Sequence, residues 1–206
     1  MRIGLDFDNT IVSYDELFYK VAIEKSLIPA NLSHSKLAVR NYLHKTGNEN
    51  AWTEMQGYVY GTRMCSAVAY PGVIEFLKFA RNKGIVLTIM SHKTKHPFLG
   101  PKYDLHAAAK EWVGSYLMEG AKPLIEPDQV FFEVTKKEKV ARIAEWKCDF
   151  FIDDLPEILL MPKFPQNTER ILFDPENNHA EAGVNAKFES WQEIKNYFEL
   201  KWKNHS

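Results

Sequence analysis

The residues best suited to chemistry stand near the start of the chain, where Asp6 and Asp8 alternate with the apolar residues Leu5 and Phe7. The apolar residues predict a buried strand, and side chains two residues apart leave a strand on the same side. Neighbouring carboxylates repel one another and are costly to bury, so they favour a bound cation, and their oxygen ligands favour Mg²⁺. The pattern indicates a phosphoryl-transfer site. An acidic turn after a strand is the alternative that this motif alone leaves open.

Polar residues follow two later apolar segments in the same way. Ser91 follows the apolar run 85–90, and Asp153 and Asp154 close the run 150–152. In a parallel sheet, ligands bind beyond the carboxyl ends of the strands. We therefore expect both aspartate pairs and the serine hydroxyl to lie along one edge of a sheet.

The elements that must position these residues alternate along the chain. Apolar runs predict strands at residues 3–7, 85–90, 130–132, 150–152 and 170–173. Helical spacing of apolar residues predicts helices near residues 73–84, 104–118, 136–147 and 158–161, and a last helix that begins near Ser190, with Glu193 as its capping partner. This alternation predicts an α/β fold with a doubly wound, mostly parallel sheet.

Residues 14–68 differ from the rest, because they contain helical patterns at 14–26, 33–44 and 52–64 and no clear strand. We therefore expect a small helical insertion at 14–68, and an α/β core formed by residues 1–13 and 69–206.

Composition excludes several classes of protein. The chain has 206 residues, 45% of them hydrophobic, and a net charge of −1, which argues against a general nucleic-acid or membrane-surface binder. No apolar run approaches the ~20 residues of a membrane span, and we expect no signal peptide. Cys65 and Cys148 are interpreted as free thiols in a reducing cytoplasm. The sequence leaves the oligomeric state open.

Four segments together resemble the motifs of the haloacid dehalogenase (HAD) superfamily. They are Leu-Asp-Phe-Asp-Asn-Thr at residues 5–10, Ile-Met-Ser at 89–91, Thr-Lys-Lys-Glu-Lys at 135–139 and Phe-Phe-Ile-Asp-Asp at 150–154. The insertion after the first motif resembles the helical cap of the C1 subgroup. Asn9 stands where many members have glycine, a departure that should not touch the chemistry.

The resemblance implies a role for each motif. Asp6 is expected to be the nucleophile and Asp8 the general acid and base, while Ser91 binds the phosphoryl group. Lys136, Lys137 and Lys139 compete as the lysine that neutralises charge there, and register with the family pattern favours Lys136.

The same resemblance implies a metal site and a substrate pocket. The expected Mg²⁺ ligands are Asp6, Asp8, Asp153 and Asp154, with Asp154 as the direct ligand and Asp153 acting through water. His92 is expected to reach the phosphate pocket. Cap residues that could grip the leaving group are Arg40, Lys45 and Arg63, although surface charge is the simpler reading of each.

These features predict a cytoplasmic, Mg²⁺-dependent phosphohydrolase that acts on a small phosphorylated metabolite through an aspartyl-phosphate. Dehalogenating relatives lack the second carboxylate, so Asp8 favours phosphoryl chemistry. A phosphomutase with the same residues and a non-catalytic module on the same scaffold are the alternatives.

Overall fold

The computed structural model describes residues 1–180 and 183–203, which form two compact units. The α/β unit contains Met1–Ile11, Ala69–His92 and the described residues from Leu117 onward. The helical unit contains Val12–Val68 and Lys93–Tyr116. Both units therefore consist of segments that are separated in the sequence.

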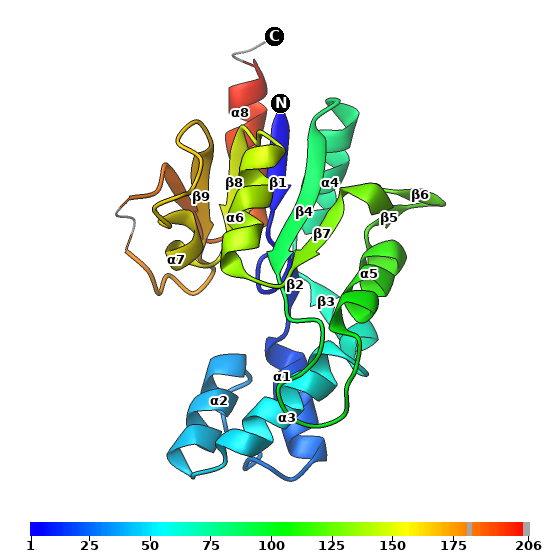
Figure 1. The fold of residues 1–206 in the computed structure, drawn as a ribbon, viewed down its shortest axis with the longest axis vertical. Coiled ribbons are helices and arrows are strands. Elements are labelled where there is room, and N and C mark those ends of the chain that lie inside the picture. Colours follow the sequence, from blue (N-terminus) through cyan, green and yellow to red (C-terminus); the bar gives the residue numbers. More distant parts are fainter. Residues whose placement is uncertain (181–182, 204–206) are drawn as a thin grey trace. The chain divides into compact units, whose positions relative to one another are not determined.

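A six-stranded parallel sheet forms the centre of the α/β unit (Figure 1). Its strands, in chain order, are β1 (Arg2–Leu5), β4 (Val86–His92), β7 (Val130–Glu133), β8 (Phe150–Asp153), β9 (Glu169–Phe173) and β10 (Ala186–Phe188). They lie side by side in the order β10-β9-β8-β1-β4-β7, and every pair is parallel. The predicted fold class is confirmed. Strand β10 was not predicted, because its three residues are all only partly buried and give no apolar run.

Helices cover both faces of this sheet (Figure 1). Helices α4 (Val73–Asn82) and α8 (Trp191–Lys203) pack together on one face, and α6 (Lys136–Glu145) lies on the other. Adjacent residues of β8 show the two faces: the Phe150 ring contacts Phe198 of α8, and the Phe151 ring lies under the Lys139 ammonium of α6. The sheet is thus doubly wound, as predicted.

Small elements complete the α/β unit. They are the hairpin β5 (Met118–Glu119) and β6 (Lys122–Pro123), the 3₁₀ turn η2 (Pro127–Gln129) and helix α7 (Pro156–Leu159). No helix among the described residues is both long enough and apolar enough to cross a membrane.

The helical unit is built from four helices and one 3₁₀ turn. They are α1 (Asp15–Glu24), α2 (Lys36–Lys45), α3 (Glu49–Tyr60), η1 (Met64–Ser66) and α5 (Leu105–Tyr116). Short strands β2 (Val12–Ser13) and β3 (Val68–Ala69) pair where the first segment of this unit begins and ends.

Helix α5 belongs to the helical unit, whereas the sequence analysis placed its residues with the α/β core. Its Trp112 indole donates a hydrogen bond of 3.0 Å to the Ala67 carbonyl, and its Tyr116 hydroxyl donates one of 2.7 Å to the Cys65 carbonyl. These contacts join α5 to η1, so the helical unit includes residues 93–116 in addition to the predicted insertion. The sequence pattern gave no sign of this pairing, because an apolar helix stripe does not identify the surface it packs on.

Strand β1 tolerates no side chain at its second buried position, Gly4. A Cβ atom there would collide with the Phe151 ring and lie 3.1 Å from Cys148 Sγ. We expect Gly4→Ala to lower the free energy of unfolding by about 1–3 kcal/mol, because overpacking forces neighbouring side chains from their places. The matched control is Gly114→Ala in α5, where a Cβ meets nothing within 4 Å and helix propensity favours alanine. Urea unfolding of both variants tests this, and equal stability of the two would contradict it.

Candidate active site

The register of the central strands brings two acidic residues together. Leu5 of β1 pairs with Ile152 of β8, and the Asp6 amide donates to the Ile152 carbonyl at 2.9 Å. The next residue of each strand is therefore an aspartate, Asp6 or Asp153, at the carboxyl edge of the sheet. Carboxylate oxygens of Asp6, Asp153 and the following Asp154 lie within 4.8 Å of one another. The predicted meeting of the first and last motifs is confirmed.

A buried lysine joins these carboxylates. Lys139 Nζ lies 2.5 Å from Asp6 Oδ1 and 2.6 Å from Asp153 Oδ2, and all three side chains are almost wholly buried. The Asp153 carboxylate also accepts a hydrogen bond of 3.0 Å from the Leu155 amide. Buried charges of this kind are stable only when each is paired and hydrogen-bonded, as these are.

Helix α6 sets the position of this lysine. A capping box fixes the start of the helix: the Glu138 amide donates to Thr135 Oγ1 at 3.1 Å, and the Glu138 carboxylate accepts from the Thr135 amide at 2.9 Å. Side chains of a helix lean toward its N-terminus. Lys139, one turn into the helix, therefore reaches back to the carboxyl edge of the sheet.

Lys136, the lysine favoured from the sequence, lies elsewhere. It occupies the first position of α6, is 42% exposed and pairs with Glu157 at 2.7 Å. The structure brings Lys139, rather than Lys136, to the carboxylates. The sequence pattern named both, and only the depth of each residue in the folded helix separates them.

Burial and ion pairing shift the pKa values of Asp153 and Lys139 in opposite directions. Burial raises the pKa of Asp153, although the Lys139 ammonium acts in the opposite direction. Burial also disfavours the ammonium, but the carboxylates of Asp153 and Asp6 outweigh it, so the pKa of Lys139 lies above its usual value. Because both contacts are short, we take the cluster as an ammonium held between carboxylates.

A tight turn after Asp6 adds a residue that the sequence analysis did not single out. Asn9 has a φ of 58°, a left-handed conformation that asparagine and glycine adopt more readily than other residues. The turn directs the buried Thr10 hydroxyl toward the acidic group, where its Oγ1 lies 3.2 Å from Asp154 Oδ1 and 3.5 Å from Asp6 Oδ2. The signal that could have found it is the threonine of the Asp-x-Asp-x-Thr pattern.

Ser91 lies near the end of β4, the strand adjacent to β1. The residue is 1% exposed, and its hydroxyl oxygen has no hydrogen-bond partner among the described residues. A buried hydroxyl without a partner is costly, so its presence suggests a ligand that supplies the missing bond. This is the environment expected for a residue that binds a phosphoryl oxygen.

Asp8 and His92 follow Asp6 and Ser91 closely in the sequence but are not part of the acidic group. Asp8 is partly buried, and within the described chain its carboxylate is not part of the group formed by Asp6, Asp153 and Asp154. His92 is also partly buried, and burial lowers its pKa with help from the Lys139 charge, which favours the neutral imidazole. Their expected roles stay predictions.

The three cap residues expected to bind substrate belong to the helical unit. Arg40 and Lys45 lie exposed on α2, and Arg63 forms an ion pair of 2.5 Å with Glu24. That hydrogen-bonded pair raises the pKa of Arg63 further above its already high value. A substrate role for these residues stays a prediction.

The acidic group has the chemistry of a divalent-cation site. Three carboxylates and one ammonium leave a formal charge of −2, and all the available ligands are oxygen atoms. Hard oxygen ligands with this charge suit Mg²⁺ better than a transition metal. The residues present therefore fit the expected cofactor.

The chain has the fold of solved structures that are described as HAD-superfamily hydrolases. No model of a known protein family matches the sequence, and neither does any curated protein. Solved structures match it over nearly their whole length, as three examples show. A predicted phosphatase from Clostridium acetobutylicum is 16% identical, with 97% of this chain and 98% of that chain covered and a TM-score of 0.59.

The second example is the archaeal β-phosphoglucomutase from Pyrococcus sp. strain ST 04, which is 15% identical, with 100% and 99% of the two chains covered and a TM-score of 0.59. The third is a HAD family hydrolase from Deinococcus radiodurans R1 with bound phosphate and sodium, which is 12% identical, with 97% and 95% covered and a TM-score of 0.57. At this identity the likeness establishes the fold, and it confirms the fold that the motifs predicted.

Replacing each lysine with methionine, an unbranched side chain that is one atom shorter and uncharged, compares the roles of Lys139 and Lys136. We expect Lys139→Met to lower the free energy of unfolding by about 3–5 kcal/mol in metal-free buffer, because it leaves two buried carboxylates without their cation. Lys136→Met removes an exposed ion pair and should cost less than about 1 kcal/mol. Denaturant unfolding of both proteins measures the difference, and similar losses would show that Lys139 does not hold the cluster together.

Proposed function

We propose that the protein is a Mg²⁺-dependent phosphohydrolase that cleaves a small phosphorylated metabolite through an aspartyl-phosphate on Asp6. The observation that carries the proposal is the buried cluster at the carboxyl edge of the sheet, in which Lys139 pairs with Asp6 and Asp153 beside Asp154. Such a concentration of charge has a clear use in phosphoryl transfer, where anionic groups must approach one another.

Asp6 makes the first new bond in this mechanism. One of its carboxylate oxygens attacks phosphorus, and the bond from phosphorus to the ester oxygen breaks with its electron pair on that oxygen. Lys139 fixes the orientation of the carboxylate and offsets the charge that gathers on the phosphoryl oxygens. The Ser91 hydroxyl supplies a hydrogen bond to one of those oxygens.

Asp8 moves the protons. It protonates the departing ester oxygen and then, as a carboxylate, accepts a proton from the water that attacks the aspartyl-phosphate. The bond between phosphorus and Asp6 breaks, and inorganic phosphate and free Asp6 result. One residue can serve both steps because the first leaves it in the state that the second needs.

Asp6, Asp153 and Asp154 would hold the metal ion, with Asp154 as the proposed direct ligand. Asp153 already engages both Lys139 and the Leu155 amide, which leaves it less available for direct ligation. When bound, Mg²⁺ supplies electrostatic stabilisation of the phosphoryl group. Cap residues of the helical unit, Arg40, Lys45 and Arg63 among them, are the proposed contacts to the leaving group.

A phosphomutase is the second candidate, favoured by the likeness to a β-phosphoglucomutase at the same TM-score as to a phosphatase. Both reactions use the same residues and differ in whether water or substrate receives the phosphoryl group. Incubation with a panel of phosphorylated sugars and other metabolites distinguishes them: a hydrolase releases inorganic phosphate, and a mutase forms an isomeric sugar phosphate. A non-catalytic module would give neither product.

The nucleophile and the metal are tested together. We expect wild-type protein to release phosphate from an aryl phosphate with Mg²⁺ and to lose this activity with a chelator, because the anionic site then repels the substrate. Asp6→Asn should abolish phosphate release, since the amide is a poor nucleophile. Asp128→Asn, at an exposed position in η2, is the matched control and should remain active. Undiminished activity of Asp6→Asn at unchanged fold stability would rule this mechanism out.

The proton-transfer role of Asp8 is tested with a nitrophenyl phosphate, whose leaving group needs little protonation. Removing general acid–base help typically slows a step by ~10²–10⁴-fold, and here the slowed step is water attack. Asp8→Asn should therefore accumulate phosphoryl-enzyme after rapid quench, and Asp6→Asn should accumulate none. Intact-protein mass measurement detects the added phosphoryl group. Wild-type turnover by Asp8→Asn without this species would exclude Asp8 as the acid–base residue.

A further inference from the structure

The C-terminal helix of the α/β unit makes a direct hydrogen bond to the turn of the first motif. The indole nitrogen of Trp191, the first residue of α8, donates to the carbonyl oxygen of Thr10 at 2.9 Å. Both residues have no exposed surface. A buried carbonyl that loses its donor is costly, so this bond constrains the turn strongly.

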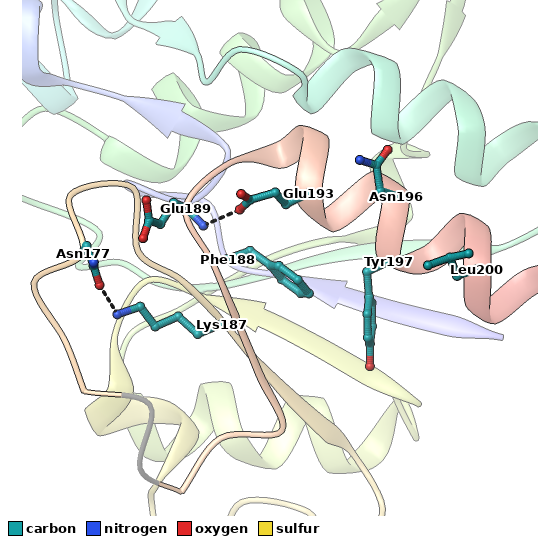
Figure 2. A pocket seen from close by; sticks show the side chains of 8 residues that line it. All are labelled: Asn177, Lys187, Phe188, Glu189, Glu193, Asn196, Tyr197 and Leu200. Carbon is teal, nitrogen blue, oxygen red and sulfur yellow. Dashed lines mark hydrogen bonds between the residues drawn. The ribbon is translucent and has the colours of Figure 1, made fainter.

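Trp191 is itself held in place by its surroundings. Its ring packs against Phe76 of α4 and Phe173 of β9, with ring centroids 5.2 and 5.7 Å away. The backbone just before it is capped, because the Glu193 carboxylate accepts hydrogen bonds from the Glu189 amide at 2.9 Å and the Ser190 amide at 3.3 Å. Figure 2 shows Glu193 reaching back to Glu189 at the start of α8. The predicted capping of this helix by Ser190 and Glu193 is confirmed, and it fixes the backbone at the residue that carries the indole.

Thr10 is hydrogen-bonded both to Trp191 and to the acidic group. While its carbonyl accepts from Trp191, its hydroxyl oxygen accepts a hydrogen bond of 3.1 Å from the Asp154 amide and lies 3.2 Å from Asp154 Oδ1. The same oxygen lies 3.5 Å from Asp6 Oδ2. One residue therefore connects the tryptophan to two of the three carboxylates that would hold the metal.

We propose that Trp191 is a positioning residue: its indole hydrogen bond fixes the turn at Thr10, and Thr10 in turn orients Asp6 and Asp154 for metal binding. Outer groups that orient metal ligands typically change metal affinity 10–100-fold when they are removed. The inference rests on the proposed metal site, but its direct consequence is the rigidity of the turn, which can be measured without metal or substrate.

Trp191→Phe removes the N–H donor and keeps an aromatic ring. Trp112→Phe is the matched control, because the Trp112 indole is 1% exposed and donates a bond of 3.0 Å to the Ala67 carbonyl in the helical unit. Three measurements on the full chain are compared: thermal unfolding, Mg²⁺ titration by calorimetry, and amide hydrogen exchange of the segment 6–11. That segment contains the Ile11 amide, which closes the turn through a bond of 3.1 Å to the Phe7 carbonyl.

We expect both variants to fold and to lose thermal stability to a similar degree. Trp191→Phe alone should bind Mg²⁺ about tenfold more weakly and exchange the amides of the turn about tenfold faster. Unchanged exchange in Trp191→Phe would overturn the inference, as would an equal effect of Trp112→Phe on Mg²⁺ affinity and on the turn. Faster exchange in Trp191→Phe, in a protein whose wild type binds Mg²⁺ but releases no phosphate, would support the positioning role and reject the proposed hydrolysis.

Discussion

The contact of one buried ammonium with two buried carboxylates is the interaction on which the rest of this site depends. Lys139 joins α6 to the ends of β1 and β8 through Asp6 and Asp153. Without the lysine, the two aspartates would be forced apart by repulsion or made neutral by protonation. The lysine alone does not balance the group, because Asp154 adds a third carboxylate. The remaining negative charge is what makes the site suited to a divalent cation.

The architecture around this contact explains how it can be maintained. The parallel sheet brings the ends of β1, β4 and β8 to one edge, and the capping box of α6 fixes the depth of the lysine. A cluster of buried apolar residues from α6, α7 and the strands beneath them includes Val140 and Ile143, which follow Lys139 in the helix. The lysine therefore stands on a helix that is itself packed in the core, and its two ion pairs hold the ammonium, which favours a preorganised site.

The fold by itself leaves the function open, since one scaffold can host many chemistries. What distinguishes this site is the combination of charge and unsatisfied polarity at the sheet edge. Lys139, Asp6 and Asp153 form a buried charged group beside the partly buried Asp154, and the Ser91 hydroxyl is buried on the adjacent strand without a partner among the described residues. Phosphoryl transfer uses both features, because an anionic group must be attracted to an anionic nucleophile and held by donors.

Sequence patterns alone predicted five of the six strands of the sheet, their alternation with helices and the edge at which the aspartates meet. They could do so because apolar runs and side-chain alternation are local properties, and parallel strands place their carboxyl ends together. Three features became visible only in the folded chain: Lys139 rather than Lys136 reaches the acidic group, α5 belongs to the helical unit, and the Trp191 indole donates to the Thr10 carbonyl. The partners lie far apart in the chain, since Lys139 is 133 residues from Asp6 and Trp191 is 181 residues from Thr10. The choice between Lys139 and Lys136 depends on how deeply the packed helix buries each of them. Local periodicity shows which face of a helix is apolar, whereas partners so distant are selected by the packing of the whole chain.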